Sequence, residues 1–272
     1  MTARTMPGGG VARAAGPAAG GAVEPGWRRS GGLLVDERLE RLGVLHGATT
    51  RALGDMADPA RRSTLFDGLG LKGETGLVLK QVHGDAIVRW PSEWDGSGTE
   101  KVRADGWMAG APSRPLCVYT ADCVPLLLWG PRFGGVFHVG WRGAAAGFAK
   151  KAAESLCRAF GAKASELCAS IGPHIGPCCY RVGPEVSSLF RRESLAMGGQ
   201  VPGGAGGSPL TGGGVAADRL DLGREVASQL VEAGLERGSV AVCGECTCCR
   251  EDLFFSYRRD KTRDSMMAFL TL

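Results

Sequence analysis

The stretch LCVYTADCVPLLLWGPRFGGVFHVGWRGAAAGFAKKAAESLCRAFG, residues 116–161, carries the patterns that decide the fold. Residues 116–120, 124–129 and 135–140 are short runs rich in Val, Leu and Ile, bounded by Gly, Pro or Asp, as β-strands are. Residues 147–161 instead repeat apolar side chains at the spacing of one helical face, and Gly161 ends the pattern. Strands followed by an amphipathic helix predict a layered domain.

The same patterns extend on both sides of this stretch. Further strands are expected at 78–84, 86–90, 167–171, 240–243, 254–257 and 266–270. Asp221 can cap a second helix that Gly234 closes, and Pro184 suits the first turn of a short third helix. The pattern predicts one domain of α/β or α+β class over residues 31–272.

Glycine is unusually abundant, with 44 residues in a chain of 272, against a typical share of roughly 7%. Residues 1–30 consist mainly of Gly, Ala, Pro and Arg without a helical or strand period, which predicts a disordered tail. A transit peptide is the alternative interpretation of this basic segment. Residues 198–214 are equally rich in glycine and predict a flexible insertion within the domain.

Composition excludes several classes of function. The formal net charge is only +4, and Lys and Arg form no run longer than a pair, so a nucleic-acid partner is not expected. No apolar run approaches the roughly 18 residues of a membrane-spanning helix. The ten cysteines follow no apolar leader, so we expect reduced thiols in the cytoplasm, with an organelle as the alternative. The sequence does not determine the oligomeric state.

A candidate metal site combines two of the four histidines with one cysteine. His83, Cys123 and His138 each stand at the end of a predicted strand. One thiolate and two imidazoles are a ligand set for Zn²⁺ that leaves a fourth position for water or substrate. Nothing in their spacing forces the three to meet, so the alternative is that they are unrelated residues.

Several further polar residues are candidates for substrate chemistry. Asp122 precedes Cys123 and could orient a ligand, act as an acid/base or merely cap a turn, and Asp105 is expected to be a turn residue. Arg142, between glycines, could bind phosphate or carboxylate, with Arg51 and Arg258 as further candidates. For each arginine a surface ion pair is the alternative.

The remaining cysteines gather mainly at 178–179 and 243–249. They could form a structural zinc site or a redox pair, but a second separated CxxC is missing. We therefore favour reduced, partly buried thiols. The sequence contains no GxxxxGK[ST] and no GxSxG, which argues against a P-loop NTPase and an α/β hydrolase.

Seven motifs in order resemble the YfiH family, also called laccase-domain or multicopper polyphenol-oxidase-like proteins. They are LHGATTR (45–51), LKQVHGD (79–85), ADG (104–106), TADCVPLLLW (120–129), HVGWRG (138–143), IGPHIGPCCYRVGPEV (171–186) and CTCCREDLFFSYRRD (246–260). The resemblance implies a single α+β domain of mixed β-sheets packed with α-helices. It also implies that His83, Cys123 and His138 are the zinc ligands.

The resemblance further implies a purine nucleoside phosphorylase that converts adenosine, inosine and 5′-methylthioadenosine, with adenosine deaminase activity. Zn²⁺ suits deamination because it acidifies bound water. Copper can be considered as the metal, with a copper-dependent polyphenol oxidoreductase as an alternative function, but four histidines are too few for a multicopper relay. A metal-dependent hydrolase that edits peptidoglycan precursors and a non-catalytic metal-binding protein are two more candidate functions.

For phosphorolysis we expect Arg142 to bind phosphate, with Arg51 and Arg258 as the next candidates for that role. We expect Asp122 to be the acid/base. The chain departs from the family after residue 260, where a Gly-Arg pair is usual and DKTRDS spans residues 260–265 instead. If the family arginine contacts substrate, Arg263 must replace it.

Overall fold

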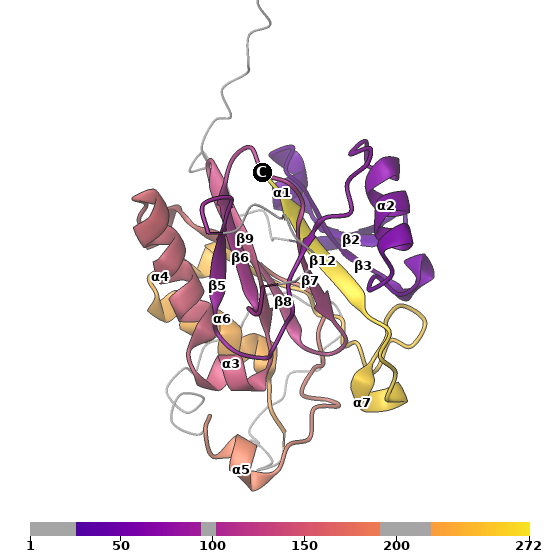
Figure 1. Ribbon diagram of the computed structural model, residues 1–272. Helices are drawn as coiled ribbons and strands as arrows, with labels where there is room; N and C mark the ends of the chain where they lie inside the picture. Colours follow the sequence, from indigo (N-terminus) through magenta and orange to yellow (C-terminus); the bar gives the residue numbers. More distant parts are fainter. Residues whose placement is uncertain (1–25, 94–101, 191–218) are drawn as a thin grey trace, which may run out of the picture.

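The computed structural model of the protein describes residues 26–93, 102–190 and 219–272, which form two packed β-sheets flanked by helices (Figure 1). The first sheet has the order β1 (Trp27–Ser30), β2 (Leu33–Asp36), β3 (Leu45–Thr49), β12 (Met266–Thr271), β7 (Leu116–Thr120), β4 (Leu77–Val78). The second has the order β11 (Val240–Val242), β10 (Cys168–Ile171), β8 (Val124–Gly130), β9 (Phe133–Val139), β6 (Gly106–Gly110), β5 (Ile87–Trp90). The pairs β4–β7, β5–β6 and β10–β11 are parallel, so both sheets are mixed, which confirms the α+β class.

Seven helices of the described residues pack around the two sheets. They are α1 (Glu37–Arg41), α2 (Pro59–Gly68), α3 (Trp141–Ala145), α4 (Phe148–Phe160), α5 (Pro184–Ser187), α6 (Leu222–Glu232) and α7 (Tyr257–Asp260). Short 3-10 turns occupy Arg51–Leu53, Ala164–Glu166 and Arg237–Ser239. Figure 1 shows α4 and α6 against the second sheet and α2 on the far side of the first. Among the described residues, no helix combines the length and apolarity needed to span a membrane.

The side chains of strand β8 point alternately to two apolar clusters, one on each face of the second sheet. Leu126 and Leu128 pack in the cluster beneath α4 and α6, whereas Leu127 and Trp129 pack between the sheets. Because successive strand residues point to opposite faces, one fully buried strand supplies both cores. Each such leucine contributes about 1.5–3 kcal/mol by burial. This continuous apolar run therefore places β8 at the centre of the molecule.

Most of the predicted elements are confirmed. The predicted strands at 86–90, 116–120, 124–129, 135–140, 167–171, 240–243 and 266–270 correspond to β5, β7, β8, β9, β10, β11 and β12. The amphipathic helix is α4, and Pro184 opens α5. Asp221 caps α6 by accepting a hydrogen bond from the backbone N–H of Arg224. These elements had clear periods and clear end signals.

Three predictions were wrong in part. The strand expected at 78–84 is reduced to β4 and an isolated bridge from Lys80 to Arg103. The backbone N–H groups of residues 82–84 donate to the Asp105 carboxylate instead of to a neighbouring strand. The strand expected at 254–257 is absent, because Ser256 caps the short helix α7. Residues 27–30, predicted as tail, form β1, while residues 1–25 and the predicted insertion at 198–214 lie outside the described residues.

A buried ion pair joins the two sheets at the end of β2. The Asp36 carboxylate, fully buried, accepts hydrogen bonds from the Arg38 guanidinium at 2.7 Å and from the Ser170 hydroxyl of β10. Arg38 also donates to the Ala169 carbonyl at 2.7 Å. Burial raises the pKa of Asp36, but hydrogen bonds and the charge of Arg38 outweigh it and hold the pKa below 3.8. The ionised carboxylate is therefore the stabilising form.

Asp36→Asn is expected to lower the free energy of unfolding at neutral pH by about 2 kcal/mol, the cost of losing a buried charge-assisted bond. Because the folded-state pKa is lowered, this contribution is present above pH 3.8 and fades as the pH falls through the folded-state value. Urea unfolding at neutral and acidic pH measures it. Glu40→Gln, which removes an exposed ion pair with Arg28, is the control and should cost at most about 1 kcal/mol. Equal losses in the two variants would contradict the prediction.

Candidate metal centre

His83, Cys123 and His138 lie together at one edge of the second sheet. Their ligand atoms are all within 4.8 Å of one another. Val124 of β8 pairs with Val139 of β9, so Cys123 and His138 leave the sheet at the same end. His83 arrives from the loop that follows β4. The structure therefore brings together three residues that are 40 and 15 positions apart in sequence.

The Asp105 carboxylate holds the loop that carries His83. It accepts hydrogen bonds from the backbone N–H groups of Val82 at 3.2 Å, His83 at 2.9 Å and Gly84 at 2.8 Å. His83 adopts a φ of 59°, which is uncommon for a residue other than glycine. Such a conformation persists only where its surroundings impose it. The hydrogen bonds to Asp105 thus fix the direction of the His83 side chain.

Asp105 also orients His138, so its predicted role as a turn residue was incomplete. The His138 Nδ1 atom lies 2.8 Å from Asp105 Oδ1, and both side chains are buried. Burial raises the pKa of Asp105, but His138 and the backbone N–H groups outweigh it and lower the pKa. An ionised carboxylate only accepts hydrogen bonds, so Nδ1 carries the proton. Nε2 is then the ring nitrogen that can coordinate a metal ion, which would displace the proton that this nitrogen carries when the ring is charged.

The electrostatics of the three side chains favour a thiolate. Burial raises the pKa of Cys123, but His138 and His83 more than offset this and lower it to about 6. Burial lowers the pKa of His138, but Cys123 and Asp105 raise it to about 9. The rings of His83 and His138 are nearly perpendicular, with centroids 4.8 Å apart. Two imidazoles and one sulfur therefore converge on a common point.

Gly140 provides the space beside this point. A Cβ atom at residue 140 would lie 3.3 Å from the Cys123 sulfur and 3.3 Å from His83 Cδ2. Those distances are tighter than ordinary carbon contacts. Any larger residue would displace the two side chains, so the HVGWRG motif keeps a glycine where the backbone passes closest to the cluster.

Asp122 links the turn before Cys123 to the C-terminal segment. Its carboxylate accepts hydrogen bonds from the Thr247 hydroxyl at 2.6 Å, the Ser256 hydroxyl at 3.0 Å and the Arg258 backbone N–H at 2.7 Å. Its φ is 96°, and its side chain is buried. With three donors already on the carboxylate, Asp122 is placed to position the turn and to cap α7.

Tyr180 is close enough to Cys123 and to two arginines for their charges to act on its hydroxyl group. Burial raises its pKa to about 12, and the negative charges of Cys123 and Asp122 act in the same direction, whereas the charges of Arg258 and Arg142 oppose them. The Arg258 guanidinium lies over the Tyr180 ring, 5.1 Å from its centroid. Two cationic side chains therefore act on one phenol near Cys123.

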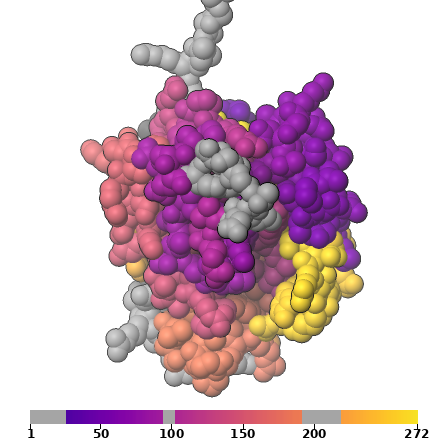
Figure 2. All heavy atoms as spheres, viewed as in Figure 1, coloured from indigo at the N-terminus to yellow at the C-terminus, as the bar shows by residue number. Residues whose placement is uncertain are grey.

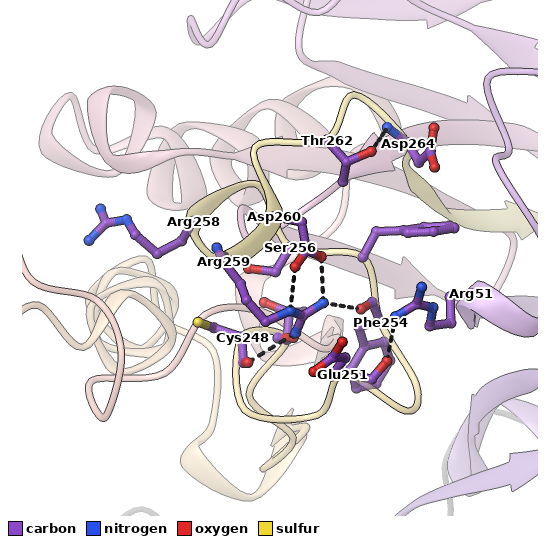
Figure 3. Close-up of polar contacts among 12 residues, drawn as sticks. Arg51, Cys248, Glu251, Phe254, Ser256, Arg258, Arg259, Asp260, Thr262 and Asp264 are labelled. Atoms are coloured by element: carbon purple, nitrogen blue, oxygen red, sulfur yellow. Dashed lines mark hydrogen bonds and ion pairs between the residues drawn. The ribbon is translucent and has the colours of Figure 1, made fainter.

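Arg51 lies apart from this group. Its guanidinium donates to the Glu251 carbonyl at 2.7 Å and lies over the Phe255 ring. Figure 3 shows Arg51 and Arg258 on opposite sides of the Ser256–Arg259–Asp260 cluster, with Arg258 pointing away from it. Arg263, the expected substitute for the family arginine, is exposed in the loop after α7. Figure 2 shows this C-terminal segment, in yellow, at the molecular surface.

The remaining two histidines, His46 and His174, form hydrogen bonds with backbone groups. His46 accepts from the Asp36 N–H at 2.8 Å, and its second ring nitrogen lies 2.8 Å from the Val44 carbonyl. His174 lies 2.8 Å from the Gly172 carbonyl and packs against Gly223 of α6. Sequence reasoning missed the positions of Asp105, Tyr180 and Thr247. Their contacts come from distant segments, and no local pattern signals them.

Comparison with known proteins gives consistent matches. Residues 54–272 match the family model described as multi-copper polyphenol oxidoreductase laccase. The chain is 31% identical to a purine nucleoside phosphorylase of Deinococcus radiodurans, over 85% of this chain and 89% of that protein. It is 32% identical to the purine nucleoside phosphorylase YlmD of Geobacillus stearothermophilus, over 77% and 76% of the two chains.

Solved structures show the same architecture. The crystal structure of YlmD from Geobacillus stearothermophilus superposes with a TM-score of 0.75 at 28% identity, covering 90% of this chain and 98% of that chain. The Bacillus licheniformis hypothetical protein YfiH gives a TM-score of 0.74 at 27% identity with the same coverage.

Proposed function

We propose that this chain, which belongs to the multi-copper polyphenol oxidoreductase laccase family, is a zinc-dependent purine nucleoside phosphorylase. The family model and the solved YfiH structure confirm the resemblance to the YfiH family. Relatives at about 30% identity bear the name purine nucleoside phosphorylase. The observation that carries the proposal is the convergence of His83, Cys123 and His138 on one point.

Zinc is the metal that these residues fit. One thiolate and two neutral imidazoles are typical of catalytic Zn²⁺ sites, which keep a fourth position open. The Asp105 hydrogen bond leaves His138 Nε2 as the donor atom, and the lowered pKa of Cys123 supplies a thiolate near neutral pH. A multicopper relay needs more imidazoles, and of the four histidines His46 and His174 are held by backbone groups. We therefore propose zinc over copper.

We assign phosphate binding to Arg142 and Arg258. The charges of both guanidinium groups act on Tyr180 in the same direction, so positive charge reaches this phenol from two separate segments of the chain. Guanidinium groups bind phosphate oxygens in a bidentate fashion. Arg258 donates to the Arg181 carbonyl at 2.7 Å and Arg51 to the Glu251 carbonyl at 2.7 Å, so these hydrogen bonds do not distinguish the two arginines. The role of Arg51 in phosphate binding stays a prediction, and we leave it out of this assignment because Arg51 and Arg258 lie on opposite sides of the Ser256–Arg259–Asp260 cluster (Figure 3).

In phosphorolysis a phosphate oxygen forms a bond to ribose C1′, the bond from C1′ to the purine nitrogen breaks, and its electron pair leaves on the base. Arg142 and Arg258 would hold the phosphate for this attack. Asp122 fixes the position of the turn before Cys123 relative to helix α7. A bound Zn²⁺ would polarise the base or acidify a water molecule. The second of these chemistries supports adenosine deamination as a proposed side activity. We propose a cytoplasmic location, because none of the ten cysteines is paired in a disulfide.

The proposal is tested by incubating the purified protein with adenosine, with and without phosphate, and separating the products. Phosphate-dependent adenine and ribose 1-phosphate are expected. Phosphate-independent inosine would report the deaminase activity alone and count against the phosphorylase. No conversion of adenosine, inosine or 5′-methylthioadenosine by zinc-loaded protein would overturn the proposal and return attention to oxidation of phenols, hydrolysis of peptidoglycan precursors or metal binding without catalysis.

Arg142→Ala is expected to raise the KM for phosphate by about tenfold to a hundredfold, because a charge-assisted contact is worth roughly 1.5–3 kcal/mol. Adenosine deamination, which uses no phosphate, should change much less. Steady-state kinetics with varied phosphate measures the effect. Arg158→Ala, an arginine on α4, is the matched control. An unchanged KM in Arg142→Ala would remove this residue from phosphate binding.

A further inference from the structure

Four cysteines outside the candidate metal centre come from two neighbouring loops. Cys178 and Cys179 follow β10, and Cys246 and Cys249 follow β11. Strands β10 and β11 are parallel neighbours, so both loops leave the same edge of the sheet. Beyond the strands the loops stay paired, since the Thr247 N–H donates to the His174 carbonyl at 3.0 Å. The topology thus brings two pairs of thiols face to face.

The four sulfur atoms form one compact cluster. All lie within 4.8 Å of one another, and the Cys249 sulfur is 3.4 Å from that of Cys178 and 3.3 Å from that of Cys179. A tetrahedral Zn²⁺ with Zn–S bonds of about 2.3 Å places its sulfurs about 3.8 Å apart. A disulfide would engage only one of the two thiols that approach Cys249 equally. The spacing therefore matches four ligands around one ion.

Backbone groups prepare Cys246 for the charge of a thiolate. The Gly176 N–H donates to its sulfur at 3.2 Å. A donated N–H stabilises the negative charge of a thiolate. The loop after β10 therefore contributes an amide that favours a thiolate at Cys246, in addition to the sulfurs of Cys178 and Cys179.

We propose that Cys178, Cys179, Cys246 and Cys249 bind one structural Zn²⁺, distinct from the centre formed by His83, Cys123 and His138. Four thiolates fill the tetrahedral coordination sphere, so this ion has no position for substrate. Binding releases the thiol protons. The proposal does not depend on the proposed function.

The site would hold the segments that surround the candidate metal centre. Tyr180 follows Cys179 directly, and Thr247, which donates to Asp122 at 2.6 Å, follows Cys246 directly. One ion would therefore fix both segments relative to each other. The sequence pattern favours reduced thiols over a zinc site because a second separated CxxC is missing. In the structure the adjacent Cys178 and Cys179 take the place of that second pair.

The test is the zinc content of the full chain and its variants, measured by elemental analysis after removal of loosely bound metal. Wild type is expected to hold two zinc ions per chain and Cys249→Ser one. Cys157→Ser, on α4 and outside both groups of metal-binding candidates, is the matched control and should hold two. Cys123→Ala should retain one. Equal zinc content in Cys249→Ser and wild type would overturn the proposal.

A second measurement covers the case in which Cys249→Ser does not fold. The Cys123→Ala variant is loaded with Co²⁺, and its thiolate-to-cobalt absorption is recorded. A strong band is expected, because the four-cysteine site remains intact in that variant, and absence of the band overturns the proposal. A band in Cys123→Ala without nucleoside turnover in the wild type would reject the proposed function and keep this inference.

Discussion

Cys123→Ala is expected to lose zinc from the candidate metal centre and to lower nucleoside turnover about a thousandfold or more. A metal ion contributes several kcal/mol to stabilisation of a transition state, and each 1.4 kcal/mol corresponds to roughly a factor of ten in rate. His83→Ala and His138→Ala should behave alike, because the three ligand atoms converge on one point. The two ligands that remain in each variant would bind Zn²⁺ too weakly to retain it in dilute solution.

The measurement pairs zinc content with product formation from adenosine and phosphate. Cys157→Ala is the matched control and should keep zinc and turnover. Cys157 is a thiol on α4 that belongs neither to the candidate metal centre nor to the four-cysteine cluster. Circular dichroism of each variant separates loss of metal from loss of fold. Unchanged turnover in all three ligand variants would reject the metal-dependent mechanism.

Asp105→Ala is expected to weaken zinc binding at the same centre by about a hundredfold and to destabilise the fold by several kcal/mol. Partners that orient a metal-ligating histidine are worth about 10–100-fold in metal affinity. Removal of this carboxylate also leaves His138 Nδ1 and three backbone N–H groups without their acceptor, each at a cost of roughly 1–3 kcal/mol.

Asp105→Asn separates the two effects. Its amide oxygen can still accept from the backbone, but it has no charge to favour the proton on His138 Nδ1, so zinc affinity should fall more than stability does. Competition with a chromophoric chelator gives the affinity, and urea unfolding of the metal-free protein gives the stability. Asp85→Asn, which removes an exposed carboxylate paired with Lys151, serves as control. Zinc affinity equal to wild type in Asp105→Asn would show that Asp105 does not orient the ligand.

Local patterns identified the elements that have strong periods. Strand β8 and helix α4 were predicted because continuous apolar runs and helical spacing are properties of neighbouring residues. The N-terminal strands β1 to β3 and helix α2 were not predicted. Their segments are short and mixed in polarity. Strand β3 pairs with β12, β1 and β2 extend the sheet from β3, and α2 packs on β12 through Phe66.

The sequence by itself determined a layered domain of strands and helices and the chemical identity of three candidate ligands, since apolar periodicity and residue type are local properties. Only the tertiary structure decided that these ligands meet, that Asp105 serves both His83 and His138, and that Asp122 holds the C-terminal segment. It also decided that the cysteines of two separate loops gather in one cluster. Each of these contacts joins residues far apart in the chain. The pairing of strands into sheets brings such residues together, and no short segment encodes that pairing.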